Sequence, residues 1–267
     1  MVREPIVAGQ FYPGDAISLK RKLDEIIIES PEKIDAIGVV SPHAGYAYSG
    51  EIAGRVFGGI KPKETYILFG PKHTPYGARF AVSIEPWITP LGEVGVDRDL
   101  AALIMDRTDL LEEDVQAHIG EHSLEVQIPF LQRVSPGASI IPIAAGPGAL
   151  SELEEIARAV SSALKEEGRE SVIVSSSDMT HFETRKSASE KDHMAIQRIL
   201  DLDPEGLYRV VEELNISMCG YIPTVMMLMA AKDLGANNAE LIQYADSGDV
   251  TGDTNDVVGY AGMVVYK

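Results

Sequence analysis

The sequence has little cysteine, little positive charge and no long apolar run. Its single cysteine, Cys219, cannot form an internal disulfide, which is typical of proteins from a reducing compartment. Lys and Arg number 23 against 41 Asp and Glu, so the formal charge is -18 and no basic block is available to neutralise a phosphate backbone. The longest apolar run, residues 221–231, is well short of the roughly 20 residues that span a bilayer, so it predicts a buried helix instead. These absences argue against nucleic acid and membranes as partners.

Composition predicts one globular domain in the cytoplasm. With 267 residues, 45% of them hydrophobic, the chain is long enough to bury a sizeable core. No low-complexity linker, internal repeat or sharp change in composition divides it, so we expect a single domain over residues 1–267. The first residues contain no apolar stretch of signal-peptide length, which favours a cytoplasmic location. An acidic, cysteine-poor chain of this length is also compatible with a homodimer.

Alternating strand-like and helix-like segments predict an α/β fold. Four runs are almost continuously apolar, as strands buried on both faces tend to be: 36–41, 65–70, 138–145 and 171–177. Between and after them, helical spacing recurs at 49–60, 97–106, 122–134, 150–166, 187–200, 204–214 and 222–234. This alternation is typical of a layered sheet flanked by helices.

Two further segments shape the predicted sheet. Residues 239–247 and 257–267 are separated by an acidic, glycine-containing loop and should form an antiparallel pair, which makes the sheet mixed. Residues 80–96 have the proline and glycine punctuation of a hairpin outside the main sheet. Trp87 in this hairpin could form the wall of a site, but a tryptophan that covers the core is the commoner outcome, so we expect a structural role.

Chemically capable side chains follow three of the predicted central strands. His43 comes directly after 36–41, His73 after 65–70, and Asp178 and His181 after 171–177. In α/β sheets, ligands bind beyond the carboxyl ends of the strands, where residues far apart in sequence converge. A lone histidine at a strand end is an ordinary polar loop residue. Three strand ends that each supply histidine favour a functional site.

Cys219 and His122 each allow a functional and a structural interpretation. Cys219 precedes a predicted helix with Pro223 in its first turn, where the helix N-terminus would favour a thiolate able to bind metal; a small buried side chain is the alternative. His122 lies at a predicted helix start beside Glu121, either as a functional residue or as part of the helix cap. His118 and His193 have no such setting, and we expect both at the surface.

The motifs together resemble those of the Memo family. The stretches VAGQFYPGD, SPHAGYAYSG, GPKHTPYG, WITPLGEVGVD, EHSLEVQIPFL, SSSDMTHFE and MCGYIP occur in the family's order, from near residue 6 to the C-terminus. The resemblance implies the fold of the class III, LigB-like extradiol dioxygenases, which are non-haem iron enzymes. Carried over residue by residue, it implies metal ligands at His43, His73 and Cys219, with Asp178, His181 and His122 lining the pocket.

One departure from the dioxygenases bears on the chemistry. Their two histidines are completed by a carboxylate, whereas the Memo-like pattern offers cysteine, which shifts the preference toward softer ions and puts catechol cleavage in doubt. Iron, copper and zinc all suit such a site, and three protein ligands leave one position open. His181 would then be a general acid or base oriented by Asp178, because imidazole titrates near neutral pH.

Two functions of different classes fit these observations. The first is a metal-dependent oxidoreductase that acts on a small molecule. The second is a non-catalytic protein that keeps the dioxygenase fold and holds a peptide or protein partner at the strand ends, as the association of eukaryotic Memo relatives with receptor signalling suggests. A hydrolase with a zinc-bound water is a third and weaker reading. Because fold does not settle function, the site must decide among them.

Overall fold

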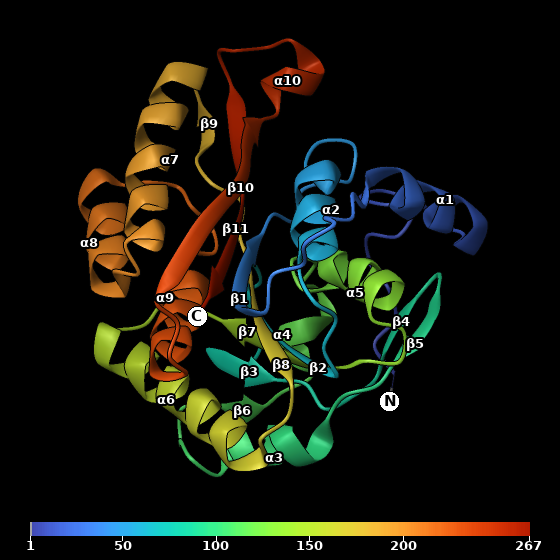
Figure 1. Cartoon of the computed structure of the whole chain (residues 1–267), viewed down its shortest axis with the longest axis vertical. Helices are drawn as coiled ribbons and strands as arrows, with labels where there is room; N and C mark the ends of the chain where they lie inside the picture. Colours follow the sequence, from blue (N-terminus) through green and yellow to red (C-terminus); the bar gives the residue numbers. More distant parts are fainter. Residues whose placement is uncertain (1) are drawn as a thin grey trace.

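A mixed nine-stranded sheet runs through the structure, a computed structural model that describes residues 2–267 (Figure 1). Its strands are β1 (Ala36–Ser41), β2 (Thr65–Pro71), β3 (Phe80–Val82), β6 (Glu112–Glu113), β7 (Ser139–Ala145), β8 (Ser171–Ser176), β9 (His181–Glu183), β10 (Asn238–Asp246) and β11 (Val257–Tyr266). The spatial order is β10-β11-β1-β8-β2-β7-β3-β6, and β9 pairs with β11. The order places β8 between β1 and β2.

The centre of the sheet is parallel and antiparallel strands flank it on both sides, while the short edge strand β6 pairs parallel with β3. β1, β8, β2 and β7 run side by side in the same direction, while β11 pairs antiparallel with β1 and β3 pairs antiparallel with β7. All residues of β2 are buried, as its unbroken apolar sequence predicts for a strand covered on both faces. The predicted α/β class and mixed sheet are therefore confirmed.

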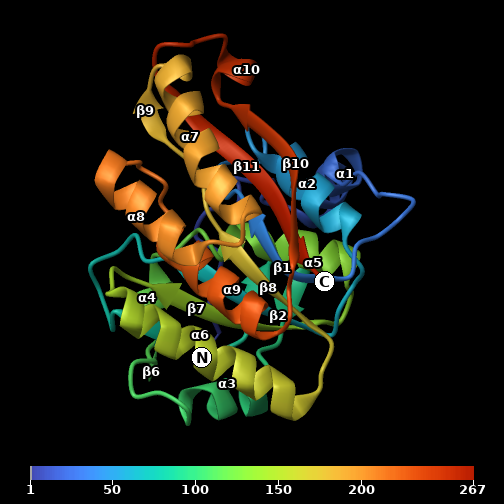
Figure 2. The same ribbon diagram turned by 60° about the vertical axis from the view of Figure 1, so that its left-hand side comes forward.

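Helices cover both faces of the sheet, as the two views in Figures 1 and 2 show. One face carries α1 (Ala16–Ile26), α2 (Gly50–Gly59) and α5 (Ile128–Val134), whose apolar side chains form one core cluster with the sheet. The other face carries α3 (Arg98–Met105), α6 (Leu150–Glu167), α7 (Arg185–Leu200), α8 (Pro204–Leu214) and α9 (Tyr221–Asp233), which form a second cluster. Short helical turns α4 (Gln116–Ile119) and α10 (Gly248–Thr251) lie in connections.

The apolar run at 221–231 forms the buried helix that the sequence predicts. α9 packs on β1, β2 and β8, and apolar side chains are buried along most of its length. A helix buried on all sides has no need of a polar face, which explains why its sequence shows so little amphipathic pattern. Within residues 2–267, none of the helices combines the length and apolar character that crossing a membrane requires.

Three details differ from the expectations. α1 was not predicted, although Asp15 caps it by accepting from the Ser18 backbone N–H and Leu19 and Leu23 form its buried stripe. The segment 122–134 is not one helix: a 3₁₀ turn (Glu125–Gln127) precedes α5, so His122 lies before the helix rather than in it. Part of the predicted hairpin, β3, joins the main sheet; only β4 (Trp87–Thr89) and β5 (Gly92–Val94) pair separately.

Of three predictions about single side chains, those for Trp87 and His193 are confirmed and that for His118 is wrong. Trp87 is fully buried in the core, as expected for a structural tryptophan. His118 is also fully buried, so its predicted surface position was wrong; its Nε2 lies 3.1 Å from the Ala81 carbonyl oxygen and its ring packs edge-on against Trp87. Burial lowers the pKa of His118 to about 4, because a charged imidazole would be desolvated there. His193 is exposed on α7, as predicted.

Candidate metal centre

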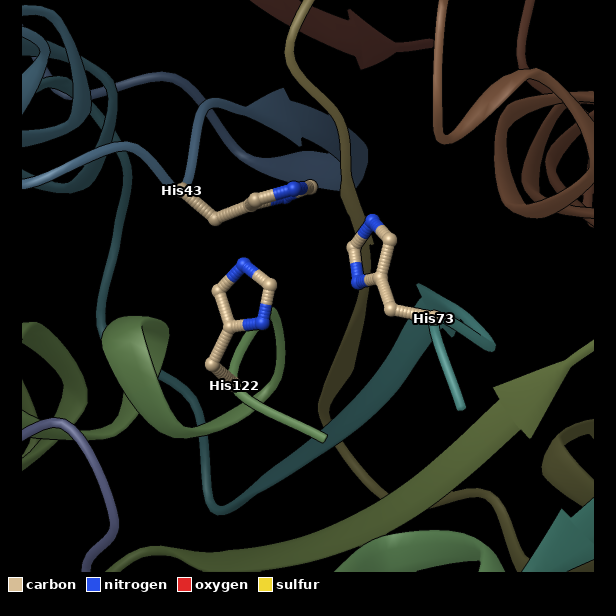
Figure 3. Close-up of side chains that lie close together, drawn as sticks. All are labelled: His43, His73 and His122. Atoms are coloured by element: carbon tan, nitrogen blue, oxygen red, sulfur yellow. The ribbon is translucent and has the colours of Figure 1, made fainter. Parts of the chain in front are cut away.

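Three histidines from separate segments converge beyond the carboxyl ends of the parallel strands. His43 follows β1, His73 follows β2, and His122 lies between α4 and the 3₁₀ turn. One potential ligand atom from each ring lies within 4.8 Å of those from the other two. Figure 3 shows the three imidazoles turned toward a common space. The convergence of His43 and His73 follows from strand order, because only β8 separates β1 from β2.

The His43 imidazole is held from behind by a buried hydroxyl. Its Nδ1 lies 2.9 Å from Ser176 Oγ. That hydroxyl donates to the Ser123 carbonyl oxygen at 2.8 Å and accepts from Gln127 Nε2 at 2.8 Å. Since the hydroxyl proton is already used, Nδ1 of His43 must be the donor to Ser176. This tautomer leaves Nε2 as the nitrogen with a free lone pair, which is the form that binds a metal.

The His73 imidazole is held in the same way by a buried carboxylate. Glu121 is fully buried, and its Oε1 lies 2.9 Å from His73 Nδ1, while its Oε2 accepts from the His73 backbone N–H at 2.7 Å. Ser123 N–H adds a third bond at 2.8 Å. Burial by itself would raise the pKa of Glu121, but the bonds and charge of His73 outweigh it and lower the pKa to about 2. Glu121 is therefore ionised near neutral pH and, as an acceptor, fixes Nδ1 of His73 as the protonated nitrogen.

The same contact raises the pKa of His73. Burial alone would lower it, but the hydrogen bond and negative charge of Glu121 more than compensate. His43 and His122 behave oppositely: burial lowers the pKa of both, to about 4 for His43. Neutral imidazoles at these two positions are ready to donate a lone pair near neutral pH.

His122 completes the cluster mainly through ring packing. Its ring stacks on His73 with centroids 4.7 Å apart and planes at 21°, and it meets His43 edge-on at 5.5 Å. Its Nδ1 is 3.9 Å from Glu121 Oε1, beyond hydrogen-bond distance. The sequence alone assigned His122 to the pocket lining; the structure places it within the group of potential ligands.

Cys219 adjoins the cluster on the His43 side. Its Sγ lies 3.3 Å from His43 Nε2 and accepts from the Asp178 backbone N–H at 3.3 Å. The residue precedes α9, as predicted, and is partly exposed overall. Desolvation of the sulfur and then the negative charge of Asp178 raise the pKa of the thiol, against the thiolate expected from the helix start. A neutral thiol at this position can donate to His43 Nε2.

The side chains of Asp178 and His181 have different hydrogen-bond partners, although only two residues lie between them in sequence. The Asp178 carboxylate accepts from the His43 backbone N–H at 2.8 Å, and its other oxygen lies 3.8 Å from His43 Nε2. His181 is held by Ser217 instead: its Nδ1 lies 2.9 Å from the Ser217 carbonyl oxygen. The expected orientation of His181 by Asp178 is therefore wrong, because the chain leaves β8 and enters β9 with the two side chains bonded to different segments.

The cluster is shielded on one side and open on the other. The His43 side chain is 3% exposed, whereas those of His73 and His122 are 32% and 25% exposed. Two buried acids, Glu121 and Asp178, stand next to the three rings. A cation among the imidazoles would thus be balanced by nearby negative charge and remain reachable from the His73 and His122 side.

Sequence reasoning missed the residues that support the cluster. Glu121 was noted only as a neighbour of His122, yet its main contacts are to His73, 48 residues away. Ser176 and Gln127 had no signal at all, since serine in a strand and glutamine in a helix start are ordinary. These contacts depend on the stacking order of the strands, which local sequence does not contain.

Comparison with known proteins gives a consistent result along the whole chain. The profile of a family described as "Memo-like protein" matches residues 3–264. A MEMO1 family protein of Methanosarcina acetivorans is 42% identical over 267 residues, covering 99% of both chains, and one of Pyrobaculum aerophilum is 39% identical over 280 residues, covering 100% of this chain and 99% of the other. An uncharacterized Escherichia coli K12 protein of known crystal structure shares the fold, with a TM-score of 0.55 at 10% identity over 85% of this chain and 98% of that one.

Proposed function

The chain belongs to the Memo family, and from that premise we propose that it is a metal-dependent oxidoreductase that acts on a small molecule. The observation that carries the proposal is the cluster of His43, His73 and His122, whose potential ligand atoms lie within 4.8 Å of one another. In this proposal the three imidazoles bind one transition-metal ion. Cys219, predicted from the sequence as the third ligand, stands beside His43 as an additional soft donor.

The chemistry of the donors suits a transition metal. In two of the three rings Nδ1 donates a hydrogen bond, from His43 to Ser176 and from His73 to Glu121. A lone pair on Nε2 of each ring is therefore available. Metal-binding histidines usually donate their other N–H to a carboxylate, hydroxyl or carbonyl, which fixes the ring and raises its basicity. A cluster of imidazoles without these supports would more often be a chance grouping of polar loop residues.

Iron and copper are the proposed ions, with zinc as an alternative. Imidazole is a good ligand for all three, and a thiol close to the site adds preference for copper or zinc over harder ions. A bound iron or copper ion would supply one-electron redox chemistry and polarise a substrate oxygen at the open side. The protein supplies binding and orientation: Glu121 and Ser176 hold the rings, and the buried side of His43 excludes water.

Asp178 and His181 are proposed as the groups that handle protons and substrate. Asp178 lies against both His43 and Cys219 and is positioned to accept a hydrogen bond from a bound molecule. His181 donates Nδ1–H to the Ser217 carbonyl, which leaves Nε2 as a proton acceptor on a partly exposed side chain. Neither residue is required to hold the metal ion.

Metal analysis of protein purified without oxygen tests the proposal. We expect about one iron or copper ion per chain after anaerobic loading, and a loss of most of it in His43→Ala, His73→Ala and His122→Ala. His193→Ala and His181→Ala are matched controls, because each removes one imidazole outside the cluster and should keep the metal. Equal losses in the controls would show that binding is not specific to the cluster.

Redox cycling then separates the oxidoreductase from its alternatives. The loaded protein should be reduced by ascorbate and reoxidised by oxygen, with oxygen uptake that disappears in His122→Ala. A bound ion that is only zinc, with no uptake, would favour hydrolytic chemistry. Failure to bind any transition metal would overturn the proposal and leave the non-catalytic holding of a peptide or protein partner.

A further inference from the structure

The three imidazoles of the cluster are not supported equally. His43 and His73 each have a hydrogen bond through Nδ1 that sets the ring plane. Among residues 2–267, the His122 side chain has no hydrogen bond, only the 3.9 Å approach of Glu121. The orientation of its ring must therefore be set by the rings that pack against it. Without such contacts the χ2 angle of a histidine side chain varies over a broad range.

The ring that packs on His122 from outside the cluster is Phe11. The two ring centroids are 5.2 Å apart with planes at 70°, an edge-to-face arrangement. His122 also stacks on His73. Phe11 and His73 both pack against the imidazole, and of these two residues Phe11 alone lies outside the histidine cluster.

Backbone hydrogen bonds fix the position of Phe11. Its N–H donates to the Val7 carbonyl at 2.9 Å, and its own carbonyl accepts from the Tyr46 N–H at 2.7 Å. The second bond ties it to the loop that follows β1 and carries His43. The position of Phe11 is therefore tied to the segment that carries His43.

A buried carboxylate locks the surrounding N-terminal segment, residues 3–12, in place. Glu125 is fully buried, and among the described residues its donors come from this segment: the guanidinium of Arg3, the backbone N–H of Ile6 at 2.9 Å, that of Val7 at 3.0 Å, and the Tyr12 hydroxyl at 2.7 Å. A carboxylate with this many charge-assisted bonds is a rigid anchor. Glu125 lies three residues after His122, so the anchor and the His122 ring belong to one short segment.

We propose that Phe11 is a positioning residue for the metal centre: its ring sets the orientation of the His122 imidazole, and the bonds of Glu125 hold the N-terminal segment where Phe11 can do so. The effect on metal affinity rests on the proposed function. The effect on the ring itself does not, because the orientation of His122 exists without a metal. A failure of the proposed function can therefore be distinguished from a failure of the inference about Phe11.

Metal affinity in a double-mutant cycle is the first test. Phe11→Ala should lower the affinity for iron or copper about 10-fold, at the lower end of the 10- to 100-fold range for residues that orient ligands. In a His122→Ala background the same change should have no further effect, since the ring that it acts on is gone. Phe11→Leu keeps bulk and folding while removing the aromatic edge, and should give a smaller loss. Gln10→Ala, an exposed neighbour, is the matched control.

Nuclear Overhauser contacts in the metal-free protein are the second test. Wild-type protein should show contacts from His122 to both Phe11 and His73, and Phe11→Leu should weaken the contact between His122 and His73. Persistence of that contact, or an equal affinity loss for Phe11→Ala in the wild-type and His122→Ala backgrounds, would overturn the inference. Absence of metal binding in the wild-type protein would overturn the proposed function, while the Overhauser contacts would still decide the role of Phe11.

Discussion

Replacement of Glu121 by glutamine should damage the metal centre without removing a ligand. The carboxylate accepts three N–H bonds, from His73 Nδ1, the His73 backbone and the Ser123 backbone, at 2.9, 2.7 and 2.8 Å. Glutamine keeps the shape but offers one acceptor oxygen, and its NH₂ group must face at least one N–H. An unsatisfied buried donor costs about 1–3 kcal/mol, so Glu121→Gln should be destabilised by about that amount.

The same change should weaken metal binding through His73. Loss of a hydrogen-bonded carboxylate behind a histidine ligand costs about 10- to 100-fold in affinity. This corresponds to about 1.4–2.7 kcal/mol. Competition with a chelator of known affinity measures it, with Glu113→Gln as the control because Glu113 is exposed on β6. Wild-type affinity in Glu121→Gln would refute the argument that Glu121 orients His73.

The acid dependence of stability gives an independent check on Glu121. Its pKa is lowered from 4.5 to about 2 in the folded protein, so its contribution to stability is present above pH 4.5 and is lost as the pH falls toward 2. A shift of this size corresponds to about 3 kcal/mol. Urea denaturation of metal-free protein at several pH values should therefore show a shallower acid slope below pH 4.5 for Glu121→Gln. An unchanged slope would show that the carboxylate is not held as an anion by His73.

Three further predictions follow from the same structure. His122→Ala should reduce metal affinity more than Cys219→Ser does, measured by chelator competition; the reverse order would restore Cys219 as the third ligand. Iron-loaded protein exposed to oxygen with a panel of catechols should form no coloured ring-opened product at rates typical of extradiol dioxygenases, because the carboxylate of their triad is missing; rapid colour would restore that reaction. The stability of the wild-type protein should fall between pH 6.5 and 4, with about 3 kcal/mol of the loss due to buried His118, which becomes protonated on unfolding, and His118→Gln should flatten this part of the profile by that amount; an unchanged profile would mean that His118 does not titrate in that range.

The sequence pattern predicted the central strands and the helices that cover them, but not which short strands join the edge of the sheet. The four parallel strands were found because strands buried on both faces are almost continuously apolar. β3 was assigned to a separate hairpin, because a three-residue strand beside Pro86 and Pro90 carries no local sign of which sheet it joins. α9 shows the opposite case, since its length and apolar character alone predicted a buried helix.

The part of the candidate site that lies at the ends of parallel strands was predicted from the sequence, and the rest was not. His43 and His73 follow parallel strands, and their convergence is a consequence of sheet geometry that a sequence can reveal. His122 belongs to an irregular segment, and nearby Glu125 joins that segment to distant N-terminal residues by hydrogen bonds that local sequence does not reveal. The pairing of Asp178 with His181 failed because proximity in sequence does not determine which way each side chain turns after a strand ends.

X-ray absorption spectroscopy of anaerobically loaded protein tests the central claim most directly. The energy of the absorption edge identifies the ion. The fine structure gives the distances from the metal to its ligands, about 2.0–2.1 Å for nitrogen and about 2.3 Å for sulfur, so the two kinds of ligand can be separated. We predict an iron or copper ion with imidazole scattering from three histidines, reduced by one imidazole in His122→Ala. A shell with fewer imidazoles that His122→Ala leaves unchanged would contradict the claim that His43, His73 and His122 hold the ion.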